Sequence, residues 1–317
     1  MFNHEAEARA FTIGDLPLIQ RLKARGISMD SASYLSRGLH TLSDATLSRL
    51  PLGHFGTPTV VVRYAGERAF GQLRHEPGSP DAHIVFVAPA LPEEYTPGQE
   101  SVWLLLLDTL LQTAGARGAH NLHAEVDENS AVFEALRRAG FASYARQDIW
   151  RRDPRPLPQP RPAVILHPAT ASDAAAIRFL HAQTVPRLAH KADPVPDTQG
   201  LVYMAGGEVR AYLAVSAGAR GIYVKPYLLL EDTATAVQVF AALLWALERA
   251  ERLPVYCCVR QYQGWLSGVL TDLGFAPWAR QTVLVRHTAA RIEHPAFAPL
   301  PSVHGSMHLP GRPTSRC

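Results

Sequence analysis

One eight-residue segment occurs twice in this chain, and its spacing constrains the fold more than any other feature. GFASYARQ at residues 140–147 returns as GFAPWARQ at residues 274–281, with six of the eight positions identical and the copies 134 residues apart. That distance is about the length of a domain and is too long for the period of a solenoid. The sequence therefore predicts two copies of one α/β unit in tandem.

The composition supports two folded units and excludes several functional classes. Of 317 residues, 47% are apolar and 19% are charged, which is enough apolar material for two cores. Lys plus Arg number 31 and Asp plus Glu 28, so the net charge of +3 arises from interspersed charges. A nucleic-acid-binding domain usually concentrates its basic residues on one face. We therefore expect no nucleic-acid partner.

The chain also lacks the signals of a secreted or membrane protein. Its three cysteines are too few for a disulfide framework, and Cys257 and Cys258 are adjacent. The longest apolar stretches, 102–111 and 234–247, contain Asp108 and Gln238 and are shorter than a membrane span of about 20 residues. The first residues include acidic side chains and no apolar core, unlike a secretory leader. These features predict a cytoplasmic protein.

A proline-rich segment marks the boundary between the two copies. DPRPLPQPRP at residues 153–162 has alternate prolines, which favour a stiff extended spacer and oppose helix. We predict an N-terminal domain at 1–152, a linker at 153–162, a C-terminal domain at 163–290 and an irregular tail at 291–317.

Within each copy, hydrophobic periodicity predicts the same order of elements. A strand and a helix come first, then a meander of three strands, and then helix, strand, helix and strand. In the first copy we expect these elements at 8–12, 15–25, 59–64, 70–75, 82–88, 101–114, 121–126, 129–139 and 141–151, with a further helix near 43–50. In the second copy we expect them at 163–167, 173–184, 200–205, 209–216, 221–229, 233–249, 255–260, 264–273 and 275–287.

This order, together with one motif, resembles the GNAT (GCN5-related N-acetyltransferase) superfamily, whose domains end in N-x-x-A/V-x-x-L-x-x-x-G-F. The first copy matches at Asn129, Val132, Leu136, Gly140 and Phe141. The second copy keeps Gly264, Leu266, Leu270, Gly274 and Phe275. The resemblance implies an α/β (α+β) fold of two tandem GNAT-like domains, each a mixed, mostly antiparallel sheet flanked by helices.

The resemblance implies acetyl-CoA as cofactor, bound through a glycine-rich loop at the N-terminus of the central helix. Both copies depart from that loop. Residues 90–101 contain a single glycine and three glutamates, and residues 226–236 contain no glycine but do contain Glu231 and Asp232. Glu100 and Asp232 would cap their helices, and the acidic residues would repel a pyrophosphate. The acetyl-CoA motifs are therefore degenerate, and the first copy is the better candidate for a site.

In the first copy the resemblance assigns cofactor binding to two groups of residues. The splayed strand would present backbone N–H groups to the acetyl carbonyl. The helix start and the motif would contact the rest of the cofactor. The residues of both groups are Phe86, Val87, Ala88, Gly98, Gln99, Ser101 and Asn129.

Glu125 is the candidate catalytic residue, because it ends the strand that borders the substrate cleft in the family. A carboxylate there could deprotonate an amine directly or through water, although a solvated strand-edge charge has the same sequence signature. The tyrosine that many members use as a general acid is replaced by Leu136 and Leu270. His120 with His123, and His304 with His308, have spacings that can ligate a metal, but no third ligand lies nearby in the sequence, so we expect no metal site.

Three functions remain open at this point. The first is transfer of an acetyl group from acetyl-CoA to an amine by the N-terminal domain. The acceptor would be a small-molecule amine, a protein N-terminus or a lysine. The second is a non-catalytic GNAT-fold binding or scaffolding protein. The third is a tandem GNAT-like transferase that uses aminoacyl-tRNA, against which the even charge distribution argues. The acceptor and the oligomeric state are not encoded in any motif.

Overall fold

The computed structural model describes residues 6–38, 57–92, 101–230 and 232–288. The part before the linker forms β1 (Glu7–Ala10), α1 (Leu16–Leu22), β2 (Ile27–Ser28), α2 (Ser31–Ser36), β3 (Thr59–Tyr64), β4 (Glu67–His75), β5 (Asp81–Ala88), α4 (Ser101–Ala116), β6 (Asn121–Val126), α5 (Ala131–Arg138) and β7 (Ala142–Arg152). The part after it forms β8 (His167–Pro168), α6 (Ala174–Thr184), β9 (Gly200–Ala205), β10 (Glu208–Ala217), β11 (Ile222–Leu228), α7 (Thr233–Ala246), β12 (Val255–Arg260), α8 (Leu266–Asp272) and β13 (Ala276–His287).

Local sequence explains where several of these helices begin and end. Ser130 caps α5 by accepting a hydrogen bond from the Phe133 N–H, as its preference for helix N-termini predicts. Gly140 and Gly274 follow α5 and α8 with φ of 82° and 80°, a left-handed conformation that glycine adopts without steric cost. The repeated glycine therefore ends the last helix of each copy in the same way.

The structure departs from the predicted elements at a few places. Strand β2 and helix α2 were not predicted. The strand predicted at 163–167 is reduced to His167–Pro168, because β9 offers it partners only at Val202 and Leu201. The helix predicted near 43–50 and the tail at 291–317 lie outside the described residues.

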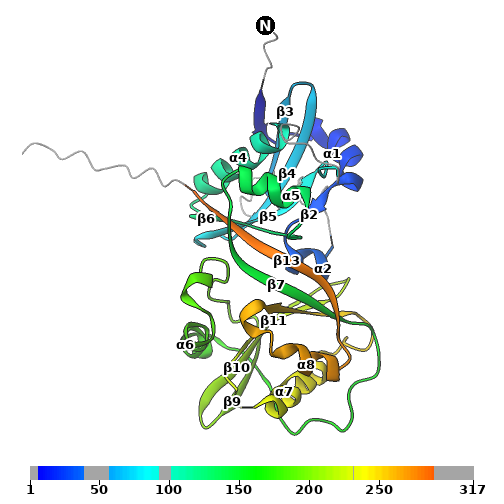
Figure 1. Cartoon of the computed structure of the whole chain (residues 1–317), viewed down its shortest axis with the longest axis vertical. Helices are drawn as coiled ribbons and strands as arrows, with labels where there is room; N and C mark the ends of the chain where they lie inside the picture. Colours follow the sequence, from blue (N-terminus) through cyan, green and yellow to red (C-terminus); the bar gives the residue numbers. More distant parts are fainter. Residues whose placement is uncertain (1–5, 39–56, 93–100, 231, 289–317) are drawn as a thin grey trace, which may run out of the picture.

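All the strands except β2 lie along one path of a single mixed, mostly antiparallel sheet. Their order is β1-β3-β4-β5-β6-β13-β7-β12-β11-β10-β9-β8. Each strand of the first copy lies as far from one end of this path as the corresponding strand of the second copy lies from the other end. The two copies thus have the same strand order. Their last strands are exchanged, since β13 pairs with β6 and β7 pairs with β12. Figure 1 shows β7 and β13 side by side where the two parts of the molecule meet.

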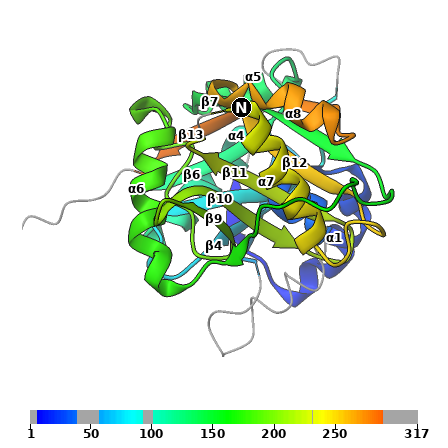
Figure 2. The same cartoon turned by 90° about the horizontal axis from the view of Figure 1, so that it is seen from below.

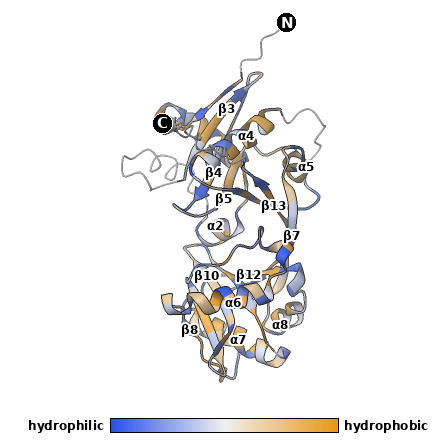
Figure 3. Cartoon of the chain, turned by 90° about the vertical axis from the view of Figure 1, so that its left-hand side faces the viewer, coloured by the Kyte–Doolittle hydropathy of each residue, from blue (hydrophilic) through white to orange (hydrophobic). Residues whose placement is uncertain are grey.

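Helices cover both faces of the sheet in each part. Helices α4 and α5 pack on one face of the first part and α1 on the other. Helices α7 and α8 pack on one face of the second part and α6 on the other, as Figure 2 shows for α6 and α7. Helix α2 belongs to the first copy but packs against β10 and β11 of the second (Figure 3). The two copies therefore share both strands and helices.

The helices of the described residues include none that is both long and apolar enough to span a membrane.

Candidate functional site

The segment between α1 and α2 fills the gap where β5 and β6 diverge. These two strands are parallel, and their pairing ends after the first three residues of each. Beyond that point β2 pairs with the free edge of β5, with Ile27 opposite Val87 and Ser28 opposite Phe86. The diverging part of β5 therefore has β4 on one side and β2 on the other.

Hydrogen bonds extend this pairing on both sides of β2. The Met29 N–H donates to the Val85 carbonyl at 3.1 Å, and the Ala90 N–H donates to the Arg25 carbonyl at 2.6 Å. The Glu125 N–H, on β6, donates to the Met29 carbonyl at 2.9 Å. Residues 25–29 thus bridge β5 and β6 and replace the pairing that those strands lose by diverging.

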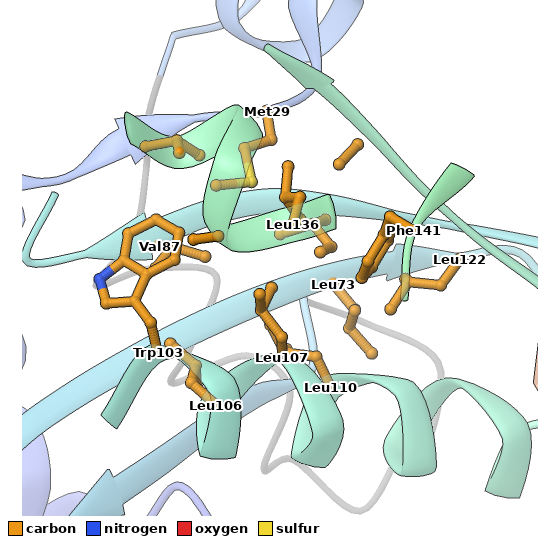
Figure 4. Close-up of a cluster of buried hydrophobic side chains, with 14 of the residues drawn as sticks. Met29, Leu73, Val87, Trp103, Leu106, Leu107, Leu110, Leu122, Leu136 and Phe141 are labelled. Atoms are coloured by element: carbon orange, nitrogen blue, oxygen red, sulfur yellow. The ribbon is translucent and has the colours of Figure 1, made fainter. Parts of the chain in front are cut away.

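Two residues of this segment, Gly26 and Met29, explain why it fits so closely. A Cβ atom on Gly26 would lie 2.1 Å from the Phe86 ring and 2.7 Å from the Val87 carbonyl oxygen, so only glycine allows the approach. The Met29 side chain is 1% exposed and belongs to the core cluster that includes Leu136. Figure 4 shows Met29 above Leu136 in that cluster. The segment is therefore part of the core.

An ion pair between buried Asp30 and partly exposed Arg74 holds the far end of the segment. Asp30 is 4% exposed, caps α2 through the Ser33 N–H, accepts a hydrogen bond from Arg74 Nε at 2.9 Å, and forms an ion pair with Arg74 Nη2 at 2.9 Å. Burial raises the pKa of the Asp30 carboxyl, but the Arg74 charge and these hydrogen bonds outweigh it and hold that pKa at about 2. Asp30 is therefore ionised at neutral pH and anchors the start of α2.

The three strand residues assigned to the cofactor lie inside this arrangement. Phe86, Val87 and Ala88 are fully buried. Phe86 and Val87 pair with β4 on one side and β2 on the other, and Ala88 pairs with Phe70. The backbone of Phe86 and Val87 could face a cofactor only after β2 had left β5.

The remaining residues assigned to the cofactor are not brought together with these. Gly98 and Gln99 lie outside the described residues. Ser101 is exposed at the start of α4, and Asn129 is exposed in the turn before α5, where Ser130 and not Asn129 supplies the cap.

Glu125 borders a pocket of about 300 Å³ next to β2. Its Oε2 accepts a hydrogen bond from the Ser31 N–H at 2.9 Å. Tyr34 lines the pocket from α2, while Trp278 and Gln281 line it from β13. The pocket is thus built by both copies, because β13 comes from the second copy and pairs with β6 of the first. The sequence did not predict Trp278 and Gln281 at this pocket, because a repeated motif does not indicate that the two copies exchange their last strands.

Two glutamines at repeat-equivalent positions connect this pocket to the second part. Gln147 and Gln281 are opposite each other in the β7–β13 pairing, and Gln147 Nε2 donates to Gln281 Oε1 at 2.9 Å. Gln281 Oε1 also accepts from Ser31 Oγ, and Gln147 Oε1 accepts from Arg260 Nη1 at 2.6 Å. Gln147 is only 2% exposed. Its strand, β7, lies between β13 and β12, where the two copies meet.

The corresponding gap of the second part, between β11 and β12, contains a buried carboxylate. Asp193 is bound by Lys225 Nζ at 2.6 Å, by Arg260 Nε at 3.3 Å, and by the hydroxyls of Tyr227 and Tyr262, each at 2.7 Å. Burial opposes its ionisation, but Lys225 and Arg260 outweigh burial and lower the pKa of the Asp193 carboxyl. Side chains of the chain itself therefore occupy both diverging gaps.

A side chain of the chain itself also occupies the N-terminus of α7. Asp232 caps this helix by accepting a hydrogen bond from the Thr235 N–H at 2.6 Å, as the sequence predicts. Its carboxylate stands where an anion would contact the helix N-terminus.

A larger cavity of about 980 Å³ lies beside the start of α4. Arg21, Arg25 and Arg68 line it, together with Pro89 and Trp103. None of the three arginines forms an ion pair with any residue that the structure describes. Glu67 lines it too, so the described lining has an excess of positive charge at the end of β5. Elsewhere in the described residues, no group of three or more His, Cys, Asp or Glu side chains is placed to hold a metal ion.

No protein-family model matches the sequence, and no curated protein matches it. A GCN5-related N-acetyltransferase from Sphaerobacter thermophilus superposes with a TM-score of 0.57 at 11% identity, over 89% of this chain and 96% of that one. A GCN5-related glucosamine N-acetyltransferase region of a fungal multi-domain β-N-acetylglucosaminidase superposes with 0.54 at 13% identity, over 90% and 38%.

The chain has the GNAT fold. In that fold the cofactor's pyrophosphate is expected at the start of the central helix and its thioester arm along the splayed strand. The arginine-lined cavity beside α4 suits the phosphates. The thioester arm does not fit along β5, because β2 takes the backbone groups that it would need.

Proposed function

We propose that this GNAT-fold chain binds a small ligand in the Glu125 pocket and does not transfer an acetyl group. The observation that carries the proposal is the pairing of residues 25–29 with β5 and β6. A thioester arm in the gap would compete with Met29 and Arg25 for the backbone groups of Val85 and Ala90. The pocket on the other side of β2 stays open to a ligand.

The cost of opening the gap supports this proposal. Withdrawal of residues 25–29 breaks the β2–β5 pairing and three further backbone hydrogen bonds, and each of these three contributes about 1 kcal/mol net. It also exposes the Met29 side chain, which costs about 2 kcal/mol. A cofactor that must first open the gap would lose at least about 5 kcal/mol of binding free energy. That loss weakens the apparent affinity by a factor on the order of 1,000 or more.

Acetyl-CoA assays on the full chain test the proposal. We expect no CoA release above the uncatalysed rate with a panel of primary amines, and an acetyl-CoA Kd weaker than about 1 mM. Release of CoA that requires an amine and is abolished by Glu125→Gln would overturn it, because Glu125 would then act as the base.

A second candidate is acetyl-CoA-dependent N-acylation by the N-terminal domain, and the arginine-lined cavity favours it. Its acceptor would be a small-molecule amine, a protein N-terminus or a lysine. If acetyl-CoA binds, Arg25→Ala and Arg68→Ala should each weaken binding about 5- to 10-fold by removing a phosphate partner. Arg178→Ala, at an exposed position of α6, is the control and should leave binding unchanged. Equal binding by all three variants would argue against this site.

A further inference from the structure

Two hydrogen-bond donors converge on one ring nitrogen of His287, the last residue of β13. The Tyr144 hydroxyl lies 3.0 Å from His287 Nε2, and Lys191 Nζ lies 3.3 Å from the same atom. Tyr144 comes from β7 of the first copy, whereas Lys191 and His287 come from the second. Lys191 and His287 are exposed and Tyr144 is half-buried, so a ligand can reach this group of three side chains, which we call the His287 site.

A series of hydrogen bonds behind His287 determines which of its nitrogens carries the proton. Asn121 Nδ2 donates to Asp81 Oδ1 at 2.8 Å, so Asn121 Oδ1 must accept from His287 Nδ1, which lies 2.7 Å away. Neutral His287 therefore holds its proton on Nδ1 and presents the lone pair of Nε2 to Tyr144 and Lys191. Because one lone pair accepts one good hydrogen bond, the two donors compete for it.

The positive charge of the His287 site lacks a carboxylate partner. Within the described part of the chain, Lys191 forms no ion pair, and its Nζ contacts an imidazole that cannot neutralise it. Partial loss of hydration lowers the pKa of His287, and the Lys191 charge lowers it further. His287 is therefore neutral at pH 7, and an anion beside it would favour its protonation.

The other titratable groups near the ring lie behind Asn121. The titratable side chains around His287 and Asp81 are Lys191 from the loop before β9, Tyr144 from β7, and His120 and His123 from the start of β6. Asp81 is the carboxylate of this network, and Asn121 stands between it and the His287 ring. A ligand anion at the exposed side of the ring would therefore not contact Asp81 directly.

We propose that the His287 site binds a tetrahedral dianion of the phosphate class, with uptake of one proton by His287. Protonated Nε2 can no longer accept from Tyr144 or Lys191, so all three groups donate, and an oxyanion is the acceptor that they then share. Two positive charges and three donors match a dianion with several oxygens better than a carboxylate. None of the three residues lines the Glu125 pocket, so this site goes beyond the proposed function.

Titration of His287 with sulfate, followed by NMR of its ring nitrogens, tests the proposal on the full chain. Sulfate keeps both charges across the neutral pH range, so any pH dependence of its binding arises from the protein. The signals are assigned by their loss in His287→Gln, and chloride at the same ionic strength is the reference. We expect sulfate to move the titration of His287 to higher pH and to bind about tenfold more tightly at pH 5 than at pH 8.

Two results would overturn the proposal. One is an unchanged titration of His287 in sulfate, with equal binding at both pH values. The other is an equal effect of acetate, which would show that the site does not select a dianion.

Matched variants separate this site from a general effect of charge. Lys191→Gln should weaken sulfate at least tenfold at the His287 signals, whereas Lys23→Gln, which removes the same charge at another exposed position, should not. Tyr144→Phe should weaken it about threefold to fivefold, and Tyr203→Phe, on β9, should not. Equal effects within either pair would contradict the assignment. Because no acetyl-CoA is present, the result is independent of the proposed function.

Discussion

Replacing Gly26 with alanine should push β2 away from β5. Gly26 has φ of −98° and ψ of 173°, an extended conformation that any residue adopts, so the effect of the substitution is purely steric. The added methyl carbon would lie 2.1 Å from Cζ of Phe86 and 2.7 Å from the carbonyl oxygen of Val87. The second of these atoms is backbone within a paired strand and cannot move aside alone. The strand segment at 27–28 must therefore shift.

The expected loss of stability follows from what that shift breaks. The hydrogen bonds at Met29, Ala90 and Glu125 contribute about 1 kcal/mol each, and the burial of Met29 about 2 kcal/mol. Because some of these contacts can be partly retained after the shift, the free energy of unfolding should fall by about 3–5 kcal/mol. For a chain of this size the melting temperature should fall by roughly 6–10 °C.

Calorimetry and urea unfolding of Gly26→Ala measure this change. Gly14→Ala is the matched control, because a Cβ at Gly14 would meet only Thr12 Oγ1 at an ordinary 3.7 Å. It should change stability by less than about 1 kcal/mol. If Gly26→Ala melted at the same temperature as Gly14→Ala, the close contact between residues 25–29 and β5 would be wrong.

Three further predictions concern the second part and the partners. Asp193→Asn should cost about 3–5 kcal/mol at pH 7, because Lys225 and Arg260 lose their counter-charge. The lowered pKa of Asp193 stabilises the fold above pH 4 and loses that effect as pH falls further, so acid unfolding curves should be flatter for the variant. Gln147→Leu should cost about 2–3 kcal/mol by removing the acceptor of Arg260, whereas exposed Gln112→Leu should cost less than about 0.5 kcal/mol in urea unfolding. Gel-shift assays with aminoacyl-tRNA should show no salt-dependent complex, and a complex would support the tRNA-using alternative.

The sequence predicted most of the fold because each element has a local signal. Alternation and helical periodicity located β3, β5, β6 and α4, and the glycine of G-F marked the end of the last helix of each copy. The repeat predicted that the two copies share one strand order, and they do. The sequence did not predict β2, because two residues of strand carry no periodicity. A signal for α2 existed in Asp30, a strong helix cap directly before Ser31.

The candidate site was less predictable because it depends on contacts between distant segments. Glu125 was identified from its place at the end of a strand. Trp278 and Gln281 reach the same pocket only because β13 pairs with β6, and a repeat gives no sign of which copy receives a strand. Asp193 lies in an irregular loop without a motif, so its partners Lys225 and Arg260 could not be inferred. Long-range pairing, rather than local propensity, decides all three cases.

Amide hydrogen exchange at Met29, Ala90 and Glu125, with and without acetyl-CoA, tests the central claim most directly. The claim is that residues 25–29 permanently occupy the gap between β5 and β6. It predicts slow exchange at all three amides in the free chain, since each donates to a backbone carbonyl, and the same rates with several millimolar acetyl-CoA. Fast exchange at Met29 and Ala90 in the free chain, or a change in rate at these positions on adding acetyl-CoA, would show that the gap opens to the cofactor and would contradict the claim.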